Sequence, residues 1–143
     1  MKEQKLVTTL PYLAFAVALV GLLGSLYFSE VMDFAPCTLC WYERIAMYPL
    51  VPILIVGILR NDRGWIFYSW PLIIFGLLVS IYHNLLYWKI IPEKLAPCQV
   101  GVSCTTEYIE WLGFITIPLL ALVGFLVLAI LIGIYHHSIR RST

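Results

Sequence analysis

Four cysteines in two pairs are the residues of this chain best suited to chemistry. Cys37 and Cys40 have the spacing C-x-x-C, and five residues separate Cys98 from Cys104. A C-x-x-C bridge closes a very small ring, so it removes little chain entropy and stabilises a fold only slightly. Small, strained bridges are instead readily exchanged, by attack of a thiolate on a disulfide sulfur. The spacing therefore predicts thiol–disulfide exchange, with electrons relayed between the two pairs.

The chain that carries these cysteines is unusually apolar. Of its 143 residues, 62% are hydrophobic and only 12% are charged, and the mean hydropathy is +0.91. Soluble domains carry about 25% charged residues, so this chain lacks the charges to cover a soluble surface. Its formal net charge of +1 gives no reason to expect a nucleic-acid partner. The composition predicts a single integral membrane domain over residues 1–143, in contact with membrane lipid.

Four apolar segments are each near the ~20 residues that a helix needs to cross a bilayer. They lie at about 8–28, 42–59, 65–88 and 111–135. We expect the first to be a retained span, because it is longer than the apolar core of a secretory signal and no cleavage site follows it. Pro49 and Pro52 predict a kink in the second. The pattern predicts an all-α integral membrane protein, a four-transmembrane-helix bundle with two cysteine-bearing outer loops at about 29–41 and 89–110.

The basic residues indicate how this bundle is oriented. They cluster at the N-terminus, in the second connection and at the C-terminus, as Lys2, Lys5, Arg60, Arg63, Arg140 and Arg141. The positive-inside rule then predicts that both termini are cytoplasmic and that both cysteine loops are extracytoplasmic. Disulfides form and persist on that side of a membrane.

Two other roles for the cysteines remain open. They could form structural disulfides, and four cysteines allow three pairings that the sequence does not distinguish. They could also form a tetrahedral zinc site, for which C-x-x-C has the right spacing and C-x5-C is loose. An oxidising location works against stable thiolate ligands, so we expect no metal here.

Exchange requires a stabilised thiolate, and the start of the second span could provide one. Cys40 is predicted to lie there, where unpaired backbone N–H groups and the helix dipole favour negative charge. Arg44 is one turn further, roughly 6 Å deeper on the same face, and places a permanent cation in apolar surroundings. Charged side chains in a membrane are costly and mark functional sites, although Arg44 could also snorkel to the interface. Glu43 could be its counter-ion or could face the headgroups.

A second polar group lies at similar depth on a different span. His83 precedes Trp88, the predicted outer end of the third span, by roughly 7.5 Å of helix. A single histidine in a span is more often packed or snorkelling, but Arg44 and His83 converging beneath a cysteine pair predict a polar-headed ligand in the membrane. A quinone fits, because it accepts two electrons and presents carbonyl oxygens to hydrogen-bond donors. Arg44 and His83 are thus the predicted cofactor-binding residues, with Arg44 stabilising charge that develops on the carbonyl.

In these residues the chain resembles the disulfide-bond formation protein B family (DsbB), especially its shorter Gram-positive branch (BdbC). Residues 37–44, CTLCWYER, match the family's C-x-L-C-x-x-E-R pattern, and Tyr82-His83 resembles the family's histidine near the end of the third span. The resemblance implies a quinone-dependent protein disulfide oxidoreductase of the bacterial cytoplasmic (inner) membrane. It would reoxidise a thioredoxin-like extracytoplasmic thiol oxidase, sustain disulfide formation in exported proteins and pass the electrons to menaquinone or ubiquinone, which the sequence does not distinguish.

The resemblance also implies a catalytic role for each cysteine. Cys98 resembles the cysteine that forms the mixed disulfide with the partner, and Cys104 resembles its companion, which can pair transiently with Cys37. Cys40 resembles the cysteine that contacts the quinone, and Arg44 resembles the arginine beside the quinone ring. The short second loop leaves open whether Cys98 or Cys104 is attacked first.

Two rival functions make different predictions. A vitamin K epoxide reductase-like enzyme also joins C-x-x-C to a quinone in a helical bundle, but its active pair lies late in the chain, whereas here the C-x-x-C comes first. A four-span scaffold with purely structural disulfides predicts cysteines that stay oxidised when quinone is removed. The relay predicts accumulated thiols under the same condition.

Overall fold

The computed structural model of the protein describes residues 2–98, 102–105 and 116–142. All regular elements in these ranges are helices: α1 (Lys2–Leu26), the π-helix η1 (Tyr27–Val31), α2 (Thr38–Met47), α3 (Leu50–Arg60), α4 (Trp65–Tyr87), the 3-10 helix η2 (Glu93–Leu95) and α5 (Ile117–Ser142). Four helical stretches are long and apolar enough to span a membrane: Val7–Val31, Thr38–Arg60, Trp65–Tyr87 and Ile117–Arg141. The predicted all-α membrane bundle with four spans is confirmed.

Several helices extend beyond the predicted spans. α1 begins at Lys2, α2 begins at Thr38 rather than near residue 42, and α5 continues to Ser142. Hydropathy locates the apolar part of a helix, whereas backbone hydrogen bonding continues into polar flanking residues. Residue 111, the predicted start of the fourth span, lies outside the described residues.

The second span is built from two helices, and prolines set the break between them. α2 ends at Met47, and Pro49 is the N-cap of α3, with its carbonyl accepting a hydrogen bond from the N–H of Ile53. Pro52 lies in the first turn of α3, where a missing N–H leaves no intrahelical bond unmade. The predicted kink therefore takes the form of a junction at Tyr48 and Pro49.

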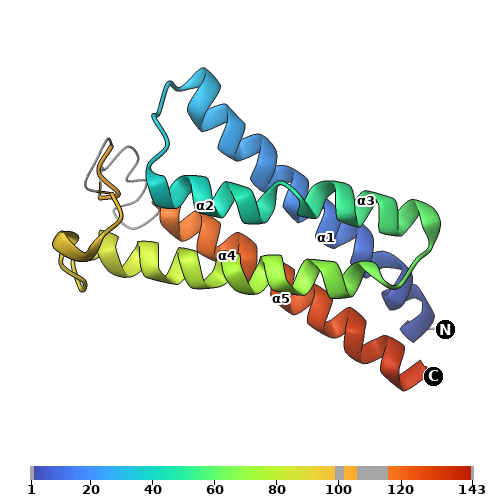
Figure 1. Cartoon of the computed structure of the whole chain (residues 1–143). Coiled ribbons are helices and arrows are strands. Elements are labelled where there is room, and N and C mark those ends of the chain that lie inside the picture. Colours follow the sequence, from blue (N-terminus) through green and yellow to red (C-terminus); the bar gives the residue numbers. More distant parts are fainter. Residues whose placement is uncertain (1, 99–101, 106–115, 143) are drawn as a thin grey trace.

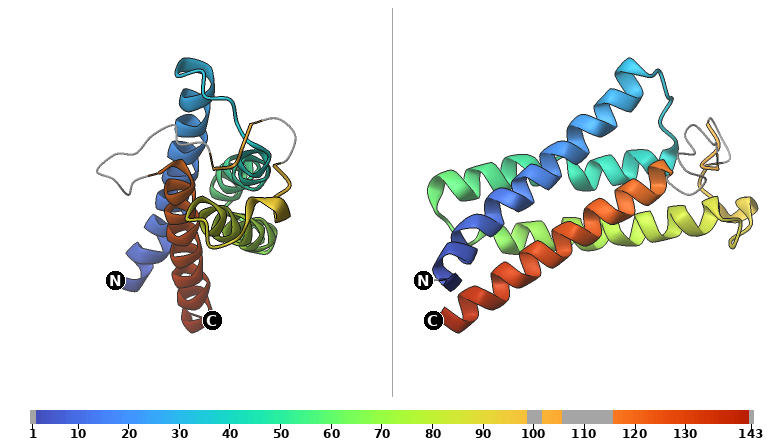
Figure 2. Two further views of the ribbon diagram at one scale, coloured as in Figure 1. Left: turned by 90° about the vertical axis from the view of Figure 1, so that its left-hand side faces the viewer. Right: turned by 180° about the vertical axis from the view of Figure 1, so that it is seen from behind.

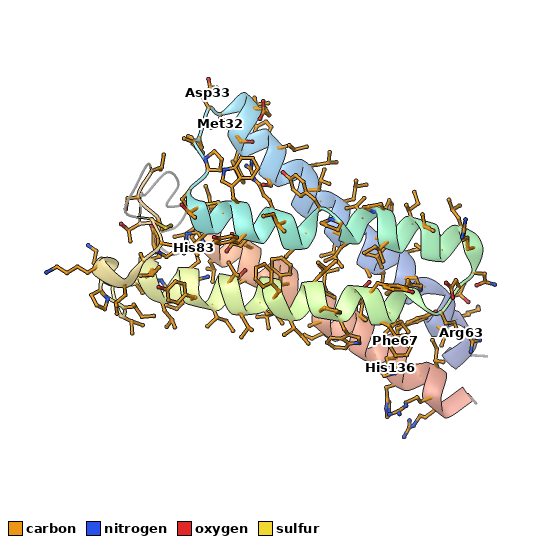
Figure 3. The ribbon with its side chains drawn as sticks, viewed as in Figure 1. Met32, Asp33, Arg63, Phe67, His83 and His136 are labelled. Atoms are coloured by element: carbon orange, nitrogen blue, oxygen red, sulfur yellow. A yellow bond between two sulfur atoms is a disulfide. The ribbon has the colours of Figure 1, made fainter. Side chains whose placement is uncertain are left out.

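The helices pack so that the chemistry gathers at one end of the bundle. α1 packs against α5 and α3, and α4 packs against α5 and α2 (Figure 1). The core side chains Leu50, Leu54, Ile73, Phe125, Leu128 and Ile132 are at most 1% exposed. Both chain ends lie at one end of the bundle, and the described parts of the two cysteine loops lie at the other (Figure 2). Figure 3 shows Arg63 and His136 at the first end and His83 at the second.

Gly76 sets how closely α4 approaches α5, which yields a prediction about stability. A Cβ at Gly76 would overlap the buried ring of Phe125, whereas a Cβ at Gly133 on α5 would meet nothing within 4 Å. We expect Gly76→Ala to lower the free energy of unfolding by about 1–3 kcal/mol because the core becomes overpacked. The matched control Gly133→Ala should be neutral, or stabilising by up to about 1 kcal/mol through helix propensity. Denaturant unfolding in detergent measures both, and equal stability of the two variants would contradict the packing.

Candidate functional site

Cys37 immediately precedes α2, and its sulfur caps the helix. It is the N-cap residue in an extended conformation (φ −74°, ψ 171°), and its Sγ accepts a hydrogen bond from the backbone N–H of Cys40 at 3.2 Å. The sequence placed Cys40 at this anion-favouring position. In the structure Cys37 occupies this position instead, because the helix begins at Thr38. Cys40 lies within the first turn and is half-buried.

A buried hydrogen-bonded pair, His83 on α4 and Glu43 on α2, lies directly beneath Cys37. His83 is 1% exposed and Glu43 is 7% exposed. His83 Nδ1 lies 3.1 Å from Glu43 Oε1, and its Nε2 lies 3.2 Å from the carbonyl oxygen of Cys104 and 3.8 Å from Cys37 Sγ. Glu43 therefore pairs with His83 and is not the counter-ion of Arg44 that we considered.

The contacts of this pair indicate how its protons are arranged. The carbonyl of Cys104 can only accept, so Nε2 of His83 carries a proton when that hydrogen bond is made. A second proton lies between Nδ1 and Glu43 Oε1, on either atom. The shared proton can thus move between Nδ1 and Oε1 while both hydrogen bonds are kept, whereas its release would break the hydrogen bond between His83 and Glu43.

Cys37 is the thiol that this arrangement makes more acidic. The hydrogen bond from the Cys40 side chain, opposed by burial and reinforced by the nearby His83 ring, lowers the pKa of Cys37 to about 5 from an ordinary value of 9.0. A thiolate is the reactive species in disulfide exchange. The lowered pKa therefore increases the share of Cys37 that is thiolate at neutral pH, although this residue is only 5% exposed.

The second cysteine pair packs against the first. Cys98 and Cys104 form a disulfide, while Cys37 and Cys40 are free thiols. Cys37 and Cys104 belong to one buried cluster with Leu39, Leu86 and Ala96, and the ligating atoms of Cys37, His83 and Cys104 all lie within 4.8 Å of one another. The bundle thus brings together residues that are more than 60 positions apart in the sequence. The sulfur of Cys37 in the first pair and the sulfur of Cys104 in the second therefore lie within 4.8 Å of each other.

A cavity of about 560 Å³ opens beside the first pair, between α1, α2 and α5. The side of this cavity formed by α2 and the junction after it carries Cys40, Glu43, Arg44 and Tyr48, whereas α1 and α5 contribute mainly apolar and small side chains. Ligand sites typically combine such an apolar lining with a few convergent polar groups. In Figure 2, α1 and α5 separate toward the end of the bundle at which α2 begins.

Arg44 is fixed at the wall of the cavity by α1. Its Nε donates to Ser25 Oγ at 2.8 Å, and its Nη2 donates to the backbone carbonyl of Ser25 at 3.0 Å. The guanidinium also lies 5.3 Å from the ring centroid of Trp41, a distance at which a cation is attracted to the face of the indole. Arg44 therefore faces the cavity from a defined position rather than extending freely to the interface.

The cavity wall suits a ligand with carbonyl oxygens. The hydroxyl of Tyr48, one turn below Arg44, is buried and has no hydrogen-bond partner among the described residues. A buried hydroxyl without a partner is costly, but this one has almost no surface open to the cavity, so a ligand would reach it only after the Tyr48 side chain moves. Arg44 thus presents a fixed cation to the cavity, and Tyr48 lines the wall one turn further along.

Not every predicted site residue lies at this cavity. Cys40 and Arg44 line it, but His83 does not, since its ring faces the cysteines and reaches the cavity only through Glu43. Sequence reasoning missed Ser25 and Tyr48 as site residues. Tyr48 follows Arg44 by four positions and therefore shares its helix face, a signal that was available, whereas nothing in the sequence singled out Ser25.

The acidity of Cys37 can be tested directly. In a reduced Cys98→Ala/Cys104→Ala variant, thiolate absorbance in the ultraviolet should show a first ionisation with a midpoint near pH 5. Because the pKa is lowered, the thiolate should be present above this pH and lost below it. Replacing His83 by Leu removes a donor to the thiolate and should raise the midpoint, whereas His136→Leu at the far end should not. A midpoint unaffected by His83→Leu would contradict this contact.

Comparisons with known proteins show the family to which the chain is similar. The family model described as "Disulfide bond formation protein DsbB" matches residues 7–135. Disulfide bond formation protein C of Bacillus subtilis (strain 168) is 47% identical over 121 residues, which cover 83% of this chain and 86% of the relative. Probable disulfide formation protein C 2 of Bacillus anthracis is 44% identical over 130 residues, or 91% of each protein. No solved structure matches the chain significantly. The resemblance is confirmed, and this multi-pass membrane protein belongs to the DsbB family of disulfide bond formation proteins.

Proposed function

We propose that this chain reoxidises a thioredoxin-like extracytoplasmic thiol oxidase and passes the electrons to a membrane quinone, so that exported proteins continue to acquire disulfides. One observation carries this proposal: Cys40 and Arg44 line an apolar cavity, while Cys37, three residues before Cys40, contacts the second cysteine pair. A path for electrons thus leads from a loop disulfide to a membrane-level cavity. The protein would lie in the bacterial cytoplasmic membrane with both termini inside and the cysteine loops outside.

The first step is exchange with the partner. A thiolate of the reduced partner attacks the Cys98–Cys104 disulfide and forms a mixed disulfide, with release of the other cysteine as a thiolate. The second partner thiol then displaces the bound cysteine. The partner leaves as a disulfide, and Cys98 and Cys104 are left as two thiols carrying its two electrons. Cys98 is half-buried and Cys104 is buried, which favours Cys98 as the sulfur that a soluble partner attacks.

The second step transfers these electrons between the pairs. Cys104 attacks Cys37 of an oxidised first pair, forming a Cys37–Cys104 disulfide and releasing Cys40 as a thiolate. Cys98 then attacks Cys104, which restores the loop disulfide and releases Cys37. Stabilisation of the Cys37 thiolate makes it a good leaving group in this exchange. The products are a Cys98–Cys104 disulfide and two free thiols at Cys37 and Cys40, which is the arrangement in the structure.

Arg44, Tyr48 and Glu43 would serve the cavity in different ways. Arg44 binds and orients a carbonyl oxygen, because its fixed charge acts most strongly in apolar surroundings, and Tyr48 shapes the wall beside it. Glu43 lines the cavity and also contacts His83, so the pair can take a proton from the thiols and hold it beside the cavity. A bound quinone supplies the capacity to accept two electrons and two protons.

Loss of Arg44 should weaken use of the quinone. We expect Arg44→Ala to reduce kcat/KM for quinone by about 10- to 100-fold, because a charge-assisted hydrogen bond contributes about 1.5–3 kcal/mol. The assay combines the chain in nanodiscs with a reduced thioredoxin-like dithiol and a quinone, whose absorbance is followed. Arg60→Ala, at the far end of α3, is the matched control, and Cys40→Ser should abolish turnover. Unchanged quinone kinetics in Arg44→Ala would refute the proposed site.

Replacement of Glu43 should separate proton transfer from binding. We expect Glu43→Gln to lower kcat by about 100-fold, the range for a lost acid–base group, with little change in KM for quinone. Exchange between the partner and Cys98–Cys104 should continue at its normal rate, because that step does not use the pair. Glu30→Gln on the exposed π-helix is the control. A normal kcat in Glu43→Gln would exclude the pair as a proton carrier.

A further inference from the structure

Three buried side chains converge where the two cysteine pairs meet, and all three are of types that bind metals. Cys37 immediately precedes α2, His83 lies on α4 and Cys104 lies in the second loop; each is at most 5% exposed. Their ligating atoms lie within 4.8 Å of one another, and Nε2 of His83 lies 3.8 Å from Cys37 Sγ. Neighbouring ligand atoms in a tetrahedral zinc site, with Zn–S near 2.3 Å and Zn–N near 2.0 Å, are about 3.5 Å apart. The cluster is therefore already close to a coordination geometry.

The surroundings of His83 strengthen this comparison. Its Nε2 lies 3.8 Å from Cys37 Sγ and 3.2 Å from the carbonyl oxygen of Cys104, a hydrogen bond that a bound cation would replace, while its Nδ1 contacts the carboxylate of Glu43 at 3.1 Å. A histidine that binds a metal through one nitrogen almost always hydrogen-bonds through the other, often to a carboxylate, which fixes the ring. Cys40 lies outside this group of three, but its side chain hydrogen-bonds to Cys37, and C-x-x-C is the spacing at which zinc sites take two cysteines.

We propose that the fully reduced chain binds a thiophilic divalent cation, such as Zn²⁺, through Cys37, Cys40, Cys104 and His83. This set is Cys₃His and omits Cys98, which differs from the four-cysteine site considered from the sequence. Cys104 becomes a ligand only after a dithiol has given two electrons to the Cys98–Cys104 disulfide and has itself been oxidised. Each ligating thiol then loses its proton to solvent, and His83 binds in its neutral form.

The site is consequently controlled by the redox state of the loop. In the oxidised chain, the sulfur of Cys104 is shared with Cys98 and is a poor ligand, so the cation has only the first pair and His83. In the reduced chain, a bound cation holds Cys37 and Cys104 apart as thiolates and blocks the disulfide between them. Rapid reoxidation of Cys98 and Cys104 would therefore prevent metal binding. A chain that remained reduced would bind the cation and could not form the disulfide between Cys37 and Cys104.

Cobalt binding tests this inference without any turnover. The full chain in detergent is reduced with a phosphine under anaerobic conditions and titrated with Co²⁺. We expect one equivalent to bind with sulfur-to-cobalt charge-transfer absorption and tetrahedral visible bands, and Zn²⁺ to displace it. The chain with Cys98–Cys104 oxidised should bind at least 10-fold more weakly. Equal binding by the oxidised chain, or a cobalt spectrum without sulfur ligation, would overturn the proposal.

Two matched cysteine variants identify the ligands. Cys98→Ser should retain cobalt binding, because Cys98 is not a ligand, whereas Cys104→Ser should lose the charge-transfer intensity of one thiolate and bind less tightly. Glu43→Gln should weaken binding by about 10- to 100-fold, the usual effect of losing the carboxylate behind a ligating histidine. Equal spectra and affinities for Cys98→Ser and Cys104→Ser would refute the proposed ligand set. The reduced chain without substitutions is the folded reference with which the spectra of both variants are compared.

Discussion

The buried hydrogen bond between His83 and Glu43 is the constraint on which the cysteine end of the bundle depends. It joins α4 to α2 immediately below the residue at which α2 begins. The same imidazole reaches the carbonyl of Cys104, so one side chain orients two helices and the second loop. Burying two ionisable groups is costly, and the cost is offset only when each is paired with good geometry. His83 and Glu43 are paired in this way, and their hydrogen bond fixes a single arrangement of the sulfurs.

In the proposed function, the same pair would let protons leave the thiols together with the electrons. Placing negative charge in an apolar cavity is expensive, because charges there are poorly screened. In the relay that we propose, sulfur-to-sulfur exchange moves electrons along Cys104, Cys37 and Cys40 but carries no protons toward the cavity. Glu43 contacts the cavity on one side and His83 on the other. It offers the protons a route parallel to that of the electrons.

The sequence was sufficient to predict the fold, but not to predict which side chains contact one another within the site. Four apolar segments and two prolines anticipated the spans and the break at Pro49, since hydropathy and proline chemistry are local properties. The convergence of Cys37, His83 and Cys104 was only partly anticipated. Depth along each helix can be counted from sequence, and it correctly placed Arg44 and His83 at one end. The direction in which a side chain faces depends on which helices are neighbours, so the partner of Glu43 was missed.

The direction in which each side chain points also decides which helices the adjacent residues Glu43 and Arg44 contact. Successive residues on a helix point about 100° apart, so Glu43 can reach α4 while Arg44 reaches α1. Arg44 is held by the hydroxyl and carbonyl of Ser25, and α1 passes into its π-helical turn two residues later, at Tyr27. π-helical turns occur often at functional sites, and this one redirects the chain at the edge of the cavity. The two polar contacts thus hold α2 from different sides, one fixing the sulfurs and the other fixing the wall of the cavity.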